Sequence, residues 1–147
     1  MSSATEDPIQ ILNDLRRMQE ADRFEIVRDL LQRRPRLGLA LANRCLRRRS
    51  YFVYIMERGL EVADASEIHD WLRCVIPRLG VRRVVRLLRG ALMRNPSGVD
   101  RAIYWMPQFV AKNRPAEVNE FRRLIEAATK AGFVRGPNMV TDVETKD

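Results

Sequence analysis

Apolar residues recur at steps of three and four along most of this chain, which is the spacing of one face of an α-helix. The stripes are Ile9, Leu12 and Leu15; Phe24, Val27, Leu30 and Leu31; Trp71, Val75 and Leu79; Ile103, Met106, Phe109 and Val110; and Phe121, Leu124, Ile125 and Ala128. No segment alternates between apolar and polar residues for the length of a strand. The apolar run of residues 51–56 follows Ser50 and has no second strand nearby to pair with. This pattern predicts an all-α chain.

Helix-start signals divide the chain into eight segments. Asp7 precedes Pro8, which combines an N-cap acid with proline at the first helical position. The expected starts, each marked by a capping side chain, a proline or a glycine break, are Asp7, Asp22, Pro35, Ser50, Asp64, Gly80, Ser97 and Pro115. Consecutive starts are 13 to 18 residues apart, which leaves room for helices of about three to four turns joined by tight connections. The sequence therefore predicts about eight short helices.

Two tryptophans repeat at similar positions relative to these starts. Trp71 lies 7 residues after Asp64, Trp105 lies 8 residues after Ser97, and an interior proline follows each tryptophan. With this even spacing, residues 7–133 resemble HEAT-like α-helical repeat proteins. The resemblance implies stacked antiparallel helical hairpins with a concave recognition face, and it implies no catalytic residue. An irregular helical bundle is the alternative architecture, and both tryptophans are expected mostly in the core.

Length and composition are those of a globular protein. At 147 residues, with 46% hydrophobic and 31% charged residues, one domain is expected. We predict a single α-helical domain over residues 1–133 and a flexible C-terminal tail over residues 134–147, where no apolar period is found. The N-terminus lacks the features of a signal peptide, and the longest apolar runs are shorter than a membrane span. A cytoplasmic protein is expected.

The sequence contains no arrangement of residues typical of a catalytic site. The single histidine, His69, excludes a histidine-based metal site within one chain, and its place early in a helix favours a surface or half-buried position. Cys45 and Cys74 have no metal-binding or redox spacing. The adjacent Arg44 and Arg73 would lower a thiol pKa, whereas the apolar neighbours favour core positions. We therefore predict a non-enzyme with no cofactor and no metal.

Charge is distributed in bands along the chain. The net charge is +8 and the pI is about 10.4, which favours anionic partners. Residues 33–49 and residues 71–94 each hold seven arginines and no acid, whereas residues 50–70 hold five acids and one arginine. The basic residues are 24 arginines and 3 lysines. Composition does not separate two explanations of this excess, a GC-rich coding sequence and the use of guanidinium groups for bidentate contacts.

The second arginine block lies on one predicted helix, residues 81–94. Arg82, Arg86 and Arg89 follow the i, i+4, i+7 spacing and share a face that lies opposite an apolar face. Two interpretations stay open. The face is solvated or paired with the acidic band of residues 57–70, or it binds an external anion through forked hydrogen bonds. The anion- or partner-binding residues expected from both blocks are Arg82, Arg83, Arg86, Arg89, Arg44, Arg47 and Arg48.

The first arginine block closes a helix, where cations stabilise the C-terminal end without any ligand. Tyr51, Phe52 and Tyr54 follow it and are expected in or beside the core, although aromatic rings there would also offer stacking surfaces for single-stranded nucleic acid. The two blocks are about forty residues apart. In a stack of helical hairpins that separation brings them close together, so we expect one merged basic patch.

These features predict a non-enzymatic helical scaffold or adaptor that binds an acidic protein partner through an arginine-rich surface. The alternative is sequence-nonspecific nucleic-acid binding through phosphate contacts. A membrane-surface role for residues 81–94 is disfavoured, because the apolar side of that helix is needed in the core. The sequence identifies no small-molecule ligand.

Overall fold

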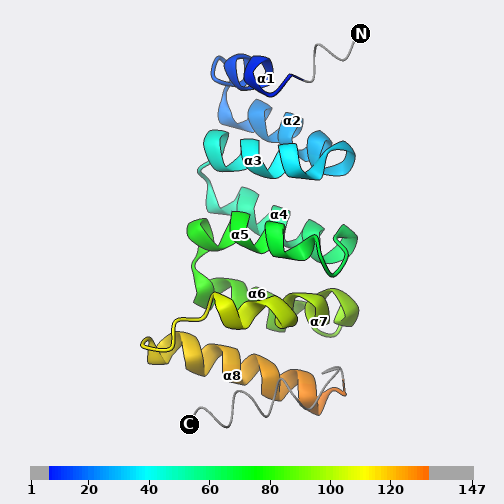
Figure 1. The fold of residues 1–147 in the computed structure, drawn as a ribbon, viewed down its shortest axis with the longest axis vertical. Coiled ribbons are helices and arrows are strands. Elements are labelled where there is room, and N and C mark those ends of the chain that lie inside the picture. The colour runs from blue at the N-terminus through cyan, green and yellow to red at the C-terminus, as the bar shows by residue number, and fades with distance from the viewer. Residues whose placement is uncertain (1–6, 133–147) are drawn as a thin grey trace. The chain divides into compact units, whose positions relative to one another are not determined.

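The computed structural model describes residues 7–132, and these residues form eight α-helices, one short 3₁₀ helix and no strand (Figure 1). The predicted all-α fold class and the expected eight helices are confirmed. The elements are α1 (Pro8–Leu15), α2 (Glu20–Arg33), α3 (Pro35–Cys45), α4 (Arg49–Val62), α5 (Ile68–Leu79), α6 (Val81–Ala91), α7 (Pro96–Trp105), η2 (Met106–Gln108) and α8 (Pro115–Lys130). Within the described part, no helix is both long enough and apolar enough to span a bilayer. The predicted tail, residues 134–147, lies outside the described residues.

Several helices begin where their local signals predict. Helices α1, α3 and α8 begin at the expected prolines, and the Asp7 carboxylate accepts a hydrogen bond from Ile9 N at 3.3 Å as the N-cap of α1. Ahead of α5, Asp64 Oδ1 accepts from Glu67 N at 2.8 Å, and Glu67 Oε1 accepts from Asp64 N at 3.0 Å. These reciprocal bonds are those of a capping box. Short-range capping chemistry is therefore visible in the sequence at both positions.

Four predicted starts are wrong. Helix α5 begins at Ile68, four residues after Asp64, because the residues between them form a turn. The other three expected starts lie one or two residues after the first residue of their helices. Asp22 lies in the first turn of α2 and Ser50 lies inside α4, so neither residue is an N-cap. Asn95 caps α7 in place of Ser97, since its Oδ1 accepts from Gly98 N at 3.1 Å. The proline between Asn95 and Ser97 explains this shift. Proline favours the first helical position, which makes the residue before it the N-cap.

The chain divides into two compact units, residues 1–52 (unit 1) and residues 53–147 (unit 2). The boundary falls inside α4, so the single domain over residues 1–133 stays a prediction. The helix packing is compatible with stacked hairpins and with a bundle. The HEAT-like arrangement therefore also stays a prediction.

In unit 1, α2 and α3 lie side by side (Figure 1). A Cβ atom at Gly38 would lie 2.9 Å from Leu31 N, so a larger residue would push these helices apart. Arg23 joins the ends of two other helices. Its Nε donates to Leu15 O at 3.0 Å and its Nη1 donates to Cys45 O at 3.1 Å. Because the last carbonyls of a helix have no intrahelical donor, one guanidinium satisfies the C-terminal ends of both α1 and α3.

Unit 2 contains Trp71, whose side chain is 1% exposed, so its predicted core position is confirmed. Gly59 on α4 makes room for the indole, since a Cβ atom there would lie 2.7 Å from Trp71 Cε3. Helix α6 packs against α5, α7 and α8. The core position expected for Trp105 is wrong. This ring is half-buried, and its Nε1 donates to Ala65 O at 2.7 Å, which holds the polar edge of the indole at the margin of the core.

Candidate arginine-rich binding surface

Helix α6 places its arginines on one side because apolar residues occupy the other side. The buried residues of α6 are Val81, Val84, Val85, Leu88 and Ala91. On the opposite side, Arg82, Arg83 and Arg86 are exposed and Arg89 is half-buried. We call these four residues the α6 arginine face. With a rise of about 1.5 Å per residue, the row from Arg82 to Arg89 extends about 10 Å along the helix axis.

Three guanidinium groups of the α6 arginine face have no hydrogen-bond or ion-pair partner within residues 7–132. They belong to Arg82, Arg83 and Arg89. Two acids of the band expected as their internal partner engage other arginines. Glu57 lies 3.2 Å from Arg94, and Glu61 lies 3.2 Å from Arg58. Glu57 and Glu61 therefore do not neutralise this row, and both solvation of the three guanidinium groups and binding of an external anion are compatible with the described residues.

Arg86 has an internal partner that sequence reasoning missed. Its Nε lies 3.4 Å from Oε2 of Glu120 on α8, and the other oxygen of Glu120 lies 3.4 Å from Arg123 Nη1. The Glu120 side chain is 5% exposed, whereas those of Arg86 and Arg123 are 52% and 64% exposed. We call these three residues the Glu120 cluster. A sequence signal does exist, because Glu120 directly precedes Phe121 and lies four residues before Leu124, on the apolar stripe of α8.

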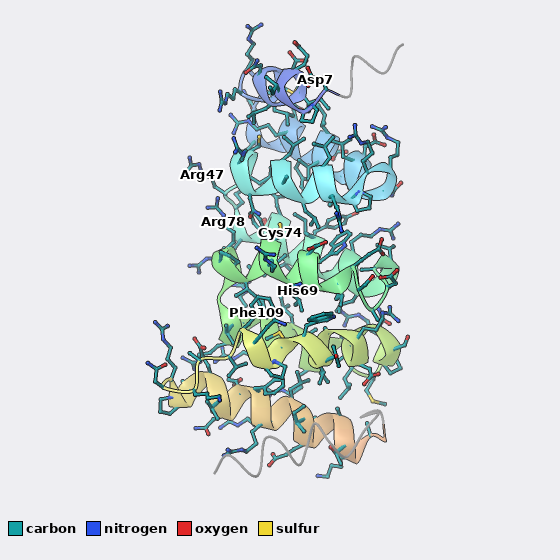
Figure 2. The ribbon with its side chains drawn as sticks, in the orientation of Figure 1. Asp7, Arg47, His69, Cys74, Arg78 and Phe109 are labelled. Atoms are coloured by element: carbon teal, nitrogen blue, oxygen red, sulfur yellow. The ribbon has the colours of Figure 1, made fainter. Side chains whose placement is uncertain are left out.

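The first arginine block belongs to unit 1. Arg44 is exposed in the last turn of α3, and Arg47 projects outward from the loop that follows (Figure 2). Arg48 is anchored, because its backbone N–H donates to Glu20 Oε2 at 3.0 Å and its Nε lies 3.5 Å from Glu20 Oε1. Partial burial would raise the pKa of Glu20, but hydrogen bonds from the backbone of Arg47 and Arg48 outweigh it and lower the pKa. This part of the block stabilises the loop without an external ligand.

The two arginine blocks lie in different units, so the merged basic patch stays a prediction. The aromatic residues after the first block pack internally. Phe52 is fully buried, which confirms its predicted core position. Tyr51 stacks on Phe24 with ring centroids 4.3 Å apart, so one face of the tyrosine is already covered.

The side chains considered as candidates for catalysis, His69, Cys45 and Cys74, lie in surroundings that serve the fold. His69, labelled in Figure 2, stacks on Trp105 with ring centroids 4.6 Å apart, and its Nε2 lies 2.9 Å from Gln108 Oε1. Burial raises the pKa of the Cys74 thiol to about 12 and also raises the pKa of Cys45, so it outweighs the arginines near both thiols. Among the residues that the structure describes, no three His, Cys, Asp or Glu side chains are grouped to hold a metal ion.

Unit 2 also has an open cavity of about 530 Å³. Its lining residues are Glu57, Leu60, Glu61, Ala91, Arg94 and Asn95. The polar side chains among them are already engaged. The two carboxylates form the ion pairs with Arg94 and Arg58, and Asn95 Nδ2 donates to Leu60 O at 2.9 Å. The α6 arginine face is therefore the stronger candidate for binding.

The α6 arginine face can bind an anion by direct hydrogen bonding. Each guanidinium offers five N–H donors in a planar fork that fits a carboxylate or a phosphate. Comparison with known proteins provides no relative from which to transfer a function, since no family model, no curated protein and no solved structure matches the chain.

Proposed function

We propose that this chain is a non-enzymatic helical scaffold or adaptor that binds an acidic protein partner through the α6 arginine face. The observation that carries the proposal is the group of three guanidinium groups on one short helix with no partner inside residues 7–132. Neighbouring arginines of unit 2, such as Arg58 and Arg94, form ion pairs instead. A row of unpaired cations on a folded helix favours association with a complementary row of anions.

The spacing of the row favours a helical partner. Arg82, Arg86 and Arg89 are separated by four and three residues, so an acidic helix with carboxylates at the same steps presents them at the same rise. An exposed ion pair contributes about 0–1 kcal/mol. Several pairs must therefore act together, and association should be fast and sensitive to salt.

Three further features belong to the same proposal. They are a HEAT-like arrangement of helical hairpins, a cytoplasmic location and a contribution of Arg44, Arg47 and Arg48 to the binding surface. The exposure of Arg44 and Arg47 supports the last of these.

Charge reversal on α6 tests the proposal. The test variant changes Arg82, Arg83 and Arg89 to Glu. The control changes Arg73, Lys112 and Lys130 to Glu, which alters the net charge equally at exposed positions outside α6. Both tagged variants and the wild type are used to capture proteins from a nuclease-treated lysate, and the captured proteins are quantified by mass spectrometry. We expect the α6 variant to lose specific partners about tenfold or more, while the control keeps them.

Circular dichroism establishes that both variants are folded. Equal recovery of every captured protein by the wild type and the α6 variant would remove the proposal. Equal loss from the α6 variant and the control would also remove it, because binding would then depend on net charge and not on this surface.

A further inference from the structure

The Glu120 cluster differs from the rest of the α6 arginine face because it joins two helices. Arg86 on α6 and Arg123 on α8 each place a nitrogen 3.4 Å from a different oxygen of Glu120. Within the described residues, Glu120 is the buried residue that carries a charge, and the rest of the buried core is apolar. A buried carboxylate depends on its cationic partners. Glu120 therefore limits where both guanidinium groups can lie.

One carboxylate does not neutralise two guanidinium groups. The Glu120 cluster keeps a net charge of +1, and the ion pairs leave most of the five N–H donors of each guanidinium unused. The side chains of Arg86 and Arg123 are more than half exposed. Donors of two neighbouring guanidinium groups, already oriented by Glu120, are thus accessible to a second anion.

We infer that the Glu120 cluster is a preorganised site for a single carboxylate, supplied by an aspartate or glutamate of the acidic partner. This inference rests on the proposed function. One carboxylate matches the net charge of +1, whereas a phosphomonoester carries about −1.5 to −2. Arg82 lies one turn before Arg86 and takes the next carboxylate of the partner helix. Arg82 has no such buried carboxylate to orient it. The guanidinium groups of the Glu120 cluster therefore lose less conformational freedom on binding than that of Arg82, and the cluster is the anchor of the interface.

Glu120→Gln separates orientation from charge. The substitution makes the cluster more positive, so charge alone predicts tighter binding of an anion. Loss of orientation predicts weaker binding, by about threefold to tenfold. The probe is a fluorescein-labelled, alanine-rich helical peptide with glutamates at i, i+4 and i+7, measured by anisotropy at low ionic strength. A version of the peptide with glutamine at those positions should bind at least about tenfold more weakly, since each lost ion pair weakens binding.

Glu126→Gln is the matched control. Glu126 is exposed on the same helix. Its substitution removes the same charge but leaves Glu120, and therefore the ion pairs of Glu120 with Arg86 and Arg123, unchanged. We expect this variant to bind the peptide as tightly as the wild type or more tightly. Binding by Glu120→Gln as tight as that of Glu126→Gln would overturn the inference.

Arg123→Lys gives a second test that does not alter the buried carboxylate, and it decides the question if Glu120→Gln fails to fold by circular dichroism. Lysine keeps the charge but loses the planar fork. We expect binding to weaken about threefold or more, against less than about twofold for Arg82→Lys. Equal effects of the two substitutions would overturn the inference.

The triple charge reversal of α6 distinguishes this inference from the proposed function. If it abolishes peptide binding while Glu120→Gln and Arg123→Lys do not weaken binding, the inference fails and the proposed function stands. If the wild type does not bind the peptide, both fail. Glu120-dependent binding of a phosphoserine peptide or of single-stranded DNA, tighter than that of the glutamate peptide, would also overturn the assignment to a carboxylate.

Discussion

Arginine has at least three roles in this chain, and the surrounding atoms distinguish them. Arg23 satisfies carbonyls at two helix ends, and Arg48 holds a loop on the carboxylate of Glu20. Arg82 is exposed and has no partner in the described part of the chain. Because all three have the same side chain, composition cannot separate structural arginines from binding ones. The unsatisfied donors of Arg82 and its neighbours are what make them candidates for partner binding.

Cys74 should be nearly inert toward alkylation in the folded protein. Burial raises its pKa to about 12, so only a very small fraction of the thiol is ionised at pH 8.5, and the thiolate is the reactive form. We expect iodoacetamide at pH 8.5 to modify Cys74 rapidly in urea and very slowly without it, as measured by peptide mass spectrometry. Rapid modification of the native protein would contradict the buried position.

The same pKa shift predicts a loss of stability at alkaline pH. The folded-state pKa lies above the ordinary value of 9.0. Cys74 therefore stabilises the folded state fully below pH 9, and this contribution is lost as the pH rises from 9 toward 12. Cys74→Ala should show a shallower decline of the free energy of unfolding over that range. An identical decline in wild type and variant would contradict this assignment.

Between elements, the approach of helices depends on individual glycines. Gly59 on α4 lies against Trp71 on α5, with space for no Cβ atom. Helix propensity alone would favour alanine at this position. The glycine is therefore explained by the indole that packs on it and not by the conformation of its own helix.

Gly59→Ala should destabilise the protein by about 1–3 kcal/mol, because the added methyl group would overlap the Trp71 ring. Gly90→Ala is the matched control, since a Cβ atom there meets nothing within 4 Å, and it should stabilise α6 by about 0.5 kcal/mol. Urea unfolding followed by tryptophan fluorescence measures both. Equal stability of the two variants would show that the Gly59 contact with Trp71 is not close.

At the scale of the whole molecule, the net charge of +8 suggests nucleic-acid binding, but the pairing of the arginines weakens that case. Five phosphate contacts from residues 81–94 would give a log–log salt slope of about −4.5 on duplex DNA. Arg86 and Arg94 have internal partners, and the remaining three arginines would give about −2.7. This difference is measurable.

We expect replacement of Arg82, Arg83 and Arg89 by Ala to change the salt slope of any duplex DNA binding by less than about one unit. The reason is that we propose a protein partner for α6, so residual DNA binding would be spread over other basic residues. Fluorescence anisotropy measures this slope between about 50 and 200 mM salt, because affinities with such slopes change strongly over that range. A decrease of about 2.7 units would favour the nucleic-acid alternative instead.

Periodicity and capping signals by themselves determined much of the fold. The steps of three and four predicted helices, and the prolines at 8, 35 and 115 located three starts. The amphipathic pattern of α6 separated its buried valines from its arginines correctly. These features are local, since they depend on residues within one or two turns, and the sequence contains all of that information.

Tertiary structure alone decided which side chains meet across helices. Arg86 pairs with Glu120, 34 residues away, and Arg23 reaches a carbonyl 22 residues away. Such pairs depend on how helices pack, and the apolar stripe that drives packing does not specify which polar groups come together at its edge. The sequence determined that arginines would line one side of α6, whereas the packing of α6 on α8 determined that Arg86 is the one that pairs with Glu120.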